Sequence, residues 1–209
     1  MLKRFLAALV VLPAAALAQD RAGAFDYWVL ALSWSPAWCA LEGEARGAAQ
    51  CETDLGWSLH GLWPQHETGY PEYCESAARN PSRGDTAAMA DIMGSGGLAW
   101  HQWNKHGRCS GMASGDYFAL SRAAYETVAR PEVFGRLTAA VRMPATVVEQ
   151  AFIEANPALF PDAITVTCRA GHVQEVRICL TRDDLSPRRC GADVIRDCGL
   201  RNALFLPVS

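Results

Sequence analysis

The chain has 209 residues, half of them hydrophobic, and carries 19 basic and 22 acidic side chains. The resulting net charge of −3 argues against an extended basic surface that holds many phosphate groups. No internal repeat, block of like charge or Ser/Gly-rich linker divides the sequence, and its length suits one domain with a substantial core.

The first eighteen residues have the pattern of a secretory signal peptide. Lys3 and Arg4 precede an apolar run over residues 5–17, and the small residues at 16–18 suit a cleavage site. The run is too short for a bilayer span of about 20 residues, and no later stretch is apolar for long enough. We therefore expect a signal peptide at 1–18 and a single exported domain at 19–209, with 17 basic and 22 acidic side chains and a net charge of −5.

All eight cysteines follow the expected cleavage site. An even number in an exported chain predicts four disulfides formed in an oxidising compartment, either the periplasm or the extracellular medium. The sequence contains no CxxC pair, so we interpret the cysteines as structural and not as reactive thiols. They are Cys39, Cys51, Cys74, Cys109, Cys168, Cys179, Cys190 and Cys198.

The first expected strand is Phe25–Ser33. It is apolar on both alternating sets of positions, which predicts a strand covered on both faces at the centre of a sheet. A second strand is expected at Leu55–Trp63. Residues 35–54 between them are rich in Gly, Ala and charge and hold two cysteines, which predicts a disulfide-tied loop.

The middle of the chain has helical periodicity. Thr146 followed three residues later by Glu149 is a capping-box signature, and Pro157 ends that helix. The expected helices are Asp85–Met93, about Leu98–His106, Tyr117–Arg130 and Thr146–Ala155.

Strand patterns return in the last third. Ala163–Cys168 and Val173–Leu180 flank a turn around Gly171 and predict a hairpin. Strands followed by helices and then by strands indicate an α+β fold, with helices packed on a largely antiparallel central sheet.

Three of the five histidines lie in two unusual segments, HGLWP at His60–Pro64 and WHQWNKHG at Trp100–Gly107. If the second segment is a helix, with about 100° per residue, four polar groups share one side of it. Trp100 and Trp103 fall on the other side, where both indoles are expected to anchor the helix in the core. The four polar residues are His101, Gln102, Lys105 and His106.

These residue types suit the cleavage of a phosphodiester. Two imidazoles, one neutral and one protonated, can act as general base and general acid. Lys105 is the single lysine after residue 18, against 16 arginines, and a compact ammonium suits a point charge beside a phosphate. RNA supplies its own nucleophile in the 2′-hydroxyl, so such a reaction needs neither a metal nor a covalent enzyme intermediate.

Other interpretations of the histidines remain open at this point. The polar side of the helix can be a solvated face, and His60 can be a strand-end histidine bonded to a backbone carbonyl. His66 and His172 are expected to be structural. Three imidazoles can also bind zinc, although the i, i+5 spacing differs from HExxH and an ammonium on the same face repels a dication.

The two segments resemble the signature motifs of the ribonuclease T2 family of secreted acid-type endoribonucleases, and the similarity runs from FDYWVLALSWSPAWC at 25–39 to EVRICL at 175–180. The resemblance implies that His106 is the general base for the 2′-hydroxyl and His60 the general acid at the 5′-oxygen. It also implies that His101 helps to hold the phosphate and that Lys105 stabilises the pentacovalent transition state. Water then opens the 2′,3′-cyclic phosphate to a 3′-phosphate.

Gln102 departs from the family pattern, which usually has glutamate in HEWxKHGTC. An amide can donate to a phosphate oxygen, but it cannot shuttle a proton or support an imidazolium by charge. We expect activity to survive with a lowered pH optimum, because the histidines lose an anionic neighbour.

RNA readers stack bases on aromatic rings and bond their edges. Trp63, with Tyr70 and Tyr73, is expected to form a stacking platform, and Gln65 to reach a base edge; the alternative is that these rings only pack the loop.

Spacing alone permits 105 cysteine connectivities. The resemblance implies the pairs Cys39–Cys51, Cys74–Cys109, Cys168–Cys198 and Cys179–Cys190.

The sequence therefore predicts an exported, monomeric endoribonuclease that acts on single-stranded RNA without a metal or another cofactor and without an obligate protein partner. One alternative is an RNA-binding member of the same fold that has lost activity through Gln102. Another is a zinc-dependent phosphoesterase.

Overall fold

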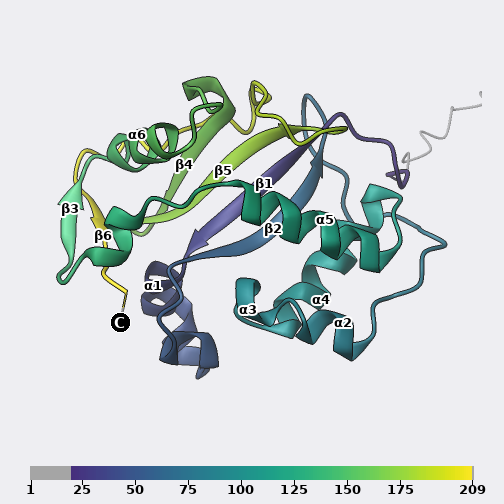
Figure 1. Cartoon of the computed structure of the whole chain (residues 1–209), viewed down its shortest axis with the longest axis horizontal. Coiled ribbons are helices and arrows are strands. Elements are labelled where there is room, and N and C mark those ends of the chain that lie inside the picture. The colour runs from purple at the N-terminus through teal and green to yellow at the C-terminus, as the bar shows by residue number, and fades with distance from the viewer. Residues whose placement is uncertain (1–19, 209) are drawn as a thin grey trace, which may run out of the picture.

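The computed structural model describes residues 20–208, and the expected signal peptide lies outside them. It contains a six-stranded sheet in the order β2-β1-β5-β6-β3, with β4 paired to β5, and helices packed against it (Figure 1). All strand pairs are antiparallel except β5 with β6, so the fold is the α+β type that the sequence predicts. The strands are β1 (Tyr27–Trp34), β2 (Trp57–Gln65), β3 (Val141–Met143), β4 (Ile164–Arg169), β5 (His172–Thr181) and β6 (Ala203–Phe205).

The predicted central strand and hairpin are confirmed. β1 lies between β2 and β5, and seven of its eight residues are buried. β4 and β5 form the hairpin, whose turn uses Ala170 and Gly171 with positive φ of 48° and 82°. Positive φ costs glycine little, which explains why the turn falls there.

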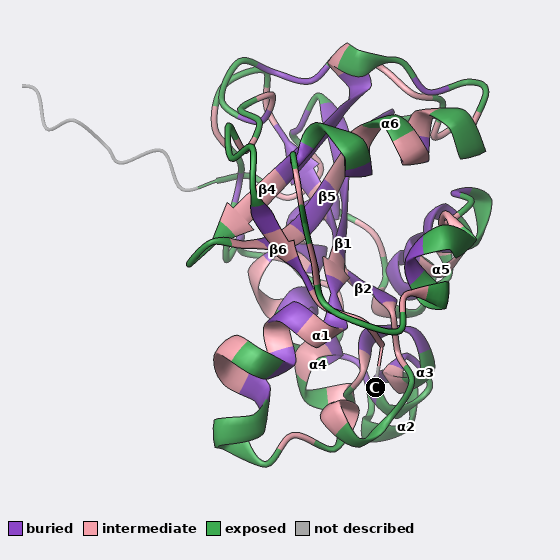
Figure 2. Ribbon diagram, turned by 90° about the vertical axis from the view of Figure 1, so that its left-hand side faces the viewer, coloured by how far each residue is buried: buried purple, intermediate pink, exposed green. Residues whose placement is uncertain are grey.

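The sheet has two different faces. Alternate side chains of β1, including Leu30 and Leu32, enter the large core, which α5 (Ser114–Thr127) and α6 (Thr146–Ala155) cover (Figure 1). The intervening side chains Tyr27 and Val29 belong to a smaller cluster with the cystine Cys179–Cys190. Figure 2 shows the buried residues concentrated in the strands and the exposed residues on the outer turns of the helices.

The loop predicted for residues 35–54 is wrong. The segment instead forms α1 (Ser35–Trp38), one π-helical turn and two 3₁₀ turns, closed by the Cys39–Cys51 disulfide. Pro36 occupies the first helical turn, where its missing N–H is no loss, and alanines continue the helical turns. The disulfide and the helical turns together hold the segment in place.

The expected helix at Asp85–Met93 is present as two short helices, α2 (Arg83–Ala87) and α3 (Ala90–Met93), and α3 ends at Gly94 with φ of 81°. α4 spans Gly96–Lys105 and α5 ends at Thr127, three residues before the predicted Arg130.

The capping box predicted at Thr146 is wrong. α6 occupies the predicted Thr146–Ala155, but its N-cap is Ala145 and no side chain caps it. Ala145 is buried and its N–H donates to the Leu200 carbonyl, so tertiary packing fixes this helix start.

Four disulfides are present, Cys39–Cys51, Cys74–Cys109, Cys168–Cys198 and Cys179–Cys190, and they are the pairs that the resemblance implies. No cysteine within residues 20–208 is free. Within the same residues, every helix is too short or too polar to cross a membrane.

Candidate active site

His60 is placed by a β-bulge in β2. The register pairs Leu59 with Leu32 and Gly61 with Ala31, so His60 is the extra residue between them. A bulge of this kind bends a strand and redirects a side chain. Leu59 and Leu62 remain in the large core on either side of the bulge, while the half-buried imidazole leaves the core face.

The His60 ring contacts Glu175, which lies with Arg177 on β5, although β1 separates the two strands. The residues of β1 that face this pair are Ala31 and Ser33, whose small side chains leave room for the contact. Nδ1 of His60 hydrogen-bonds to Oε1 of Glu175, and Arg177 donates to Oε2 at 2.8 and 3.1 Å. Burial alone would raise the pKa of Glu175, but His60 and then Arg177 outweigh it and lower the pKa to about 2.

α4 carries the second motif and is fixed at both ends. Ser95 accepts a hydrogen bond from the backbone of Leu98 at the N-terminus, and Trp103 is fully buried and donates to Asn80 at 3.1 Å. The expectation that Trp100 also anchors the helix is wrong, because its side chain is 43% exposed. One indole is enough to orient the polar side of α4 toward β2.

His106 follows α4 as its C-cap residue and is buried. Its ring stacks on Trp63 with centroids 5.2 Å apart, and its Nδ1 has no hydrogen-bond partner in the described part of the chain. Burial, followed by the charges of Lys105, His60 and His101, lowers the pKa of His106 to about 3. The imidazole is therefore neutral at pH 5, and Nε2 is the nitrogen left to a substrate.

Trp63 joins the two motifs. Its indole N–H donates to Oε1 of Gln102 at 2.7 Å, and its ring also lies 5.2 Å from His60. Gly61 lies beneath this hydrogen bond, and a Cβ there would lie 2.3 Å from the indole nitrogen and 2.4 Å from the Gln102 oxygen. Glycine is therefore required for the two motifs to meet.

Lys105 and Tyr70 form another wall. The Lys105 ammonium lies 5.7 Å from the centre of the Tyr70 ring and 3.4 Å from a carboxylate oxygen of Glu72. The loop that carries Tyr70 is tied to the end of α4 by the fully buried Cys74–Cys109 disulfide. This bond keeps the two segments in fixed relation.

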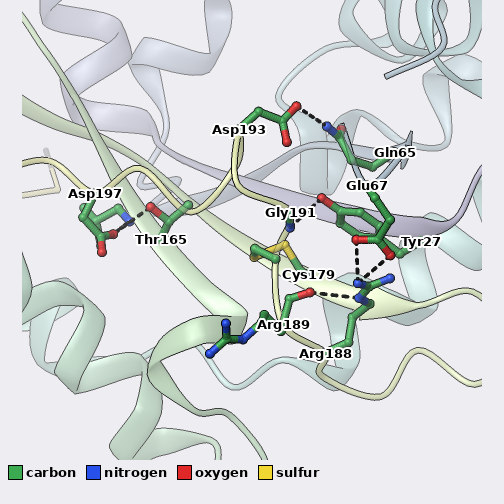
Figure 3. The surroundings of a disulfide bond; sticks show 12 residues. Tyr27, Gln65, Glu67, Thr165, Cys179, Arg188, Arg189, Gly191, Asp193 and Asp197 are labelled. Atoms are coloured by element: carbon green, nitrogen blue, oxygen red, sulfur yellow. Dashed lines mark hydrogen bonds and ion pairs between the residues drawn. A yellow bond between two sulfur atoms is a disulfide. The ribbon is translucent and has the colours of Figure 1, made fainter. Parts of the chain in front are cut away.

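The segment after Cys190 forms the last wall. The Cys179–Cys190 disulfide attaches it to β5, and the Gly191 N–H donates to the hydroxyl of Tyr27 at 3.1 Å (Figure 3). Asp193 then accepts a hydrogen bond from Gln65 at 3.4 Å and from the backbone of Gly69 at 2.8 Å.

These walls line an open cavity with a volume of about 310 Å³, which is within the usual range for small-molecule sites. Each of the eight candidate catalytic and substrate-binding residues lines it. Tyr73 does not; it is 55% exposed, and its backbone bonds to Lys105. His66 lies 3.7 Å from Asp26, and His172 bonds to the Ala170 carbonyl, so both have structural partners outside the cavity. The eight lining candidates are His60, Trp63, Gln65, Tyr70, His101, Gln102, Lys105 and His106.

Three further residues at the site, Glu175, Arg177 and Asp193, lie outside both sequence motifs and were not predicted; Arg177 and Asp193 line the cavity, and Glu175 contacts His60. A signal for the first two is present in the expected strand Val173–Leu180, because Glu175 and Arg177 alternate with the apolar Val176 and Ile178 and therefore lie on the opposite face. Asp193 follows a cysteine in an irregular segment, and no periodicity points to it.

No group of three or more His, Cys, Asp and Glu side chains within residues 20–208 is arranged to hold a metal ion. The imidazoles that the sequence left open as zinc ligands are among these side chains, and they are not arranged as a metal site.

The model of the ribonuclease T2 family matches residues 25–190, which is most of the chain, and this chain therefore belongs to that family. A ribonuclease of Aeromonas hydrophila is 40% identical over 131 residues, which cover 61% of this chain and 59% of that protein. The match thus spans little more than half the length of this curated relative.

Solved structures show the same fold. An RNase-related protein from Calystegia sepium aligns over 88% of this chain and 97% of its own, with a TM-score of 0.65 and 19% identity. RNase NT in complex with 5′-AMP aligns over 88% of this chain and 98% of its own, with a TM-score of 0.60 and 17% identity.

Proposed function

We propose that this chain is an endoribonuclease that cleaves single-stranded RNA by metal-independent transesterification through a 2′,3′-cyclic phosphate. The observation that carries the proposal is that His60 from β2 and His106 from the end of α4 line one cavity together with Lys105. Two imidazoles and a cation are the groups that such a reaction needs.

The environments of the two imidazoles favour different roles. His106 is buried beside cationic groups, with a pKa of about 3, and its neutral ring is suited to accept the proton of the 2′-hydroxyl. His60 bonds to a carboxylate through Nδ1 and can present an N–H at Nε2. As the 2′-oxygen attacks phosphorus, His106 takes its proton, the bond from phosphorus to the 5′-oxygen breaks, and His60 protonates that oxygen.

The remaining polar groups are assigned to the phosphate. Lys105 stabilises the negative charge of the pentacovalent transition state, and His101 helps to hold the phosphate. Gln102 keeps its oxygen on Trp63, and its NH₂ group can donate to a phosphate oxygen. In the second step the two histidines exchange roles, and water opens the cyclic phosphate.

Trp63 and Tyr70 are assigned as stacking surfaces for a base, and Gln65 as a donor or acceptor to a base edge. All three line the cavity with the catalytic residues. RNase NT, which shares the fold, is in complex with the nucleotide 5′-AMP, and this supports a nucleotide as the ligand.

The decisive experiment is incubation of the purified protein with a short RNA in EDTA. We expect cleavage with 2′,3′-cyclic phosphate ends and no cleavage of DNA of the same sequence, because DNA lacks the internal nucleophile. Binding without cleavage would support the impaired RNA-binding alternative, and cleavage that EDTA abolishes would support a metal-dependent phosphoesterase.

Replacing Gln102 with glutamate is expected to raise the pH optimum of cleavage by about one unit, because a carboxylate beside the histidines favours their charged forms. The measurement is a pH–rate profile of Gln102→Glu beside that of the wild type. Gln150→Glu, an equal change of charge at an exposed position of α6, is the control and should leave the optimum unchanged. An unchanged or lower optimum in Gln102→Glu would contradict the expectation.

We further propose that the chain is exported after removal of residues 1–18 and acts as a single-domain monomer in the periplasm or the medium. The signal-like sequence and the four disulfides support export. Mass determination of the mature protein and its elution volume on a sizing column test both statements.

A further inference from the structure

Glu175 is a buried carboxylate in contact with a histidine of the cavity, and neither sequence motif contains it. Its side chain is 4% exposed, and both of its oxygens have partners. Oε1 accepts from Nδ1 of His60 and from the Ser33 hydroxyl at 3.3 Å, and Oε2 accepts the two hydrogen bonds from Arg177. The carboxylate is therefore held from two sides in one orientation.

The charge of Glu175 determines which nitrogen of His60 carries a proton. Because its pKa is about 2, the carboxylate is ionised at neutral and mildly acidic pH, and there it can only accept hydrogen bonds. Nδ1 of His60 must then be the donor, both in the neutral ring and in the imidazolium. Nε2 is left to face the cavity, as an N–H when the ring is charged and as an acceptor when it is neutral.

The backbone reinforces this arrangement. The bulge turns His60 across β1, and the register places Ser33 opposite Glu175 and Ala31 opposite Arg177. β2 pairs with β1 and β1 pairs with β5, and side chains on paired strands of one sheet have regular spacing. The distance between the His60 ring and its carboxylate is thus set by the sheet and not by a mobile loop.

We propose that Glu175 is the positioning residue for His60: it fixes the Nδ1–H form of the ring and turns Nε2 toward the phosphodiester, and Arg177 holds Glu175 in turn. This inference rests on the proposed function of the cavity. In the first step the proton on Nε2 passes to the 5′-oxygen as its bond to phosphorus breaks, and Glu175 stays ionised. Carboxylates in catalytic triads act in the same way: they orient the catalytic histidine and do not take its proton.

Other charged groups also face His60, and they set the background for any pH effect. α4 and its C-cap contribute three of them, β5 contributes the arginine, and the segment after Cys190 contributes a carboxylate farther along the wall. Gln102 and Trp63 are neutral, so replacement of Glu175 removes the negative charge that touches the ring. The charged or titratable groups are His101, Lys105, His106, Arg177 and Asp193.

Nuclear magnetic resonance of the histidine side chains tests the inference without any assay of activity. In ¹⁵N-labelled wild type at neutral pH we expect His60 to be the Nδ1–H tautomer with a hydrogen-bonded, strongly downfield Nδ1 proton. Loss of that signal in His60→Ala assigns it. A His60 ring found as the Nε2–H tautomer would overturn the inference, whether or not the protein cleaves RNA.

Kinetics of Glu175→Gln provide the second test. The amide can still accept from Nδ1 but carries no charge, so we expect kcat to fall by about 10–10⁴-fold with little change in KM, the range for loss of carboxylates that orient a histidine in metal sites and in catalytic triads. The basic limb of the pH profile should move to lower pH, and Glu175→Ala, which also loses the acceptor, should be slower still. Asp197→Asn, a carboxylate that binds Thr165 outside the cavity (Figure 3), is the control and should behave as wild type.

The kinetic outcomes distinguish a positioning role of Glu175 from a purely structural role. A wild-type rate and profile in Glu175→Gln would overturn the inference while leaving the proposed ribonuclease intact. A slower Glu175→Gln with an unshifted pH profile and an unchanged His60 signal would show a structural role and would also overturn it. A wild type that does not cleave RNA would refute the proposed function, and the resonance of His60 would still decide whether Glu175 orients the ring.

Discussion

Replacing His106 with alanine is expected to lower kcat/KM for RNA cleavage by about 10²–10⁴-fold, the usual contribution of a general base. The buried imidazole is neutral and stacked on Trp63, so its Nε2 has a fixed position in the cavity. Initial rates on a short RNA at pH 5, with circular dichroism to confirm folding, measure the effect. His172→Ala, at the tip of the β4–β5 hairpin, is the matched control and should keep the wild-type rate.

The lowered pKa of His106 predicts where the acid limb of the wild-type pH profile lies. Burial, and then the neighbouring charges, lower the pKa of His106 to about 3, so the base form persists as the pH falls below the ordinary value of 6.5. We expect kcat/KM to be maintained at pH 5 and to fall as the pH approaches 3, since this parameter reports the free enzyme. A His106→Ala protein of near wild-type rate, or an acid limb centred near 6.5, would contradict the assignment of His106 as base.

Removing the Cys74–Cys109 disulfide by a double substitution to alanine is expected to lower the free energy of unfolding by about 2–5 kcal/mol and to reduce cleavage even below the melting temperature. The bond closes 35 residues of sequence, and both sulfurs are fully buried. It also ties the loop carrying Tyr70 to the end of α4, where Lys105 and His106 lie. Loss of the bond frees two walls of the cavity at once.

Thermal or denaturant unfolding and cleavage rates at 25 °C measure the two effects separately. The control is removal of Cys39–Cys51, which closes 12 residues of sequence away from the cavity. That variant should lose stability but keep its cleavage rate. If both double variants cleave RNA equally well at 25 °C, then Cys74–Cys109 does not hold the site in place.

The sequence predicts local structure best where burial repeats with a regular period. The continuous apolar run of β1 and the alternation in β5 correctly give a central strand and a hairpin. At residues 35–52 the composition of a loop is misleading, because Pro36 starts helical turns that the Cys39–Cys51 bond then holds. The capping signature at Thr146 fails for a related reason, since packing of Ala145 selects a different first residue.

The candidate site is predicted in part, for a physical reason. Helical geometry shows that His101 and Lys105 share a side of α4, and both line the cavity. The contact of His60 with Glu175 depends on the register of three strands and on one inserted residue. Periodicity within a segment contains no information about such a register, so this partner emerges only from the folded sheet.

At the bulge in β2, the residues that form the core differ from the residue that is assigned to catalysis. Leu59 and Leu62 maintain the core on either side of it, and Glu175 would keep Arg177 as an ionic partner if the imidazole were absent. A library selected only for soluble, folded protein should therefore accept many residues at position 60, and most of its members would be inert. Anyone improving the thermal tolerance of this chain must screen turnover as well, because the apolar core around the bulge does not include this ring.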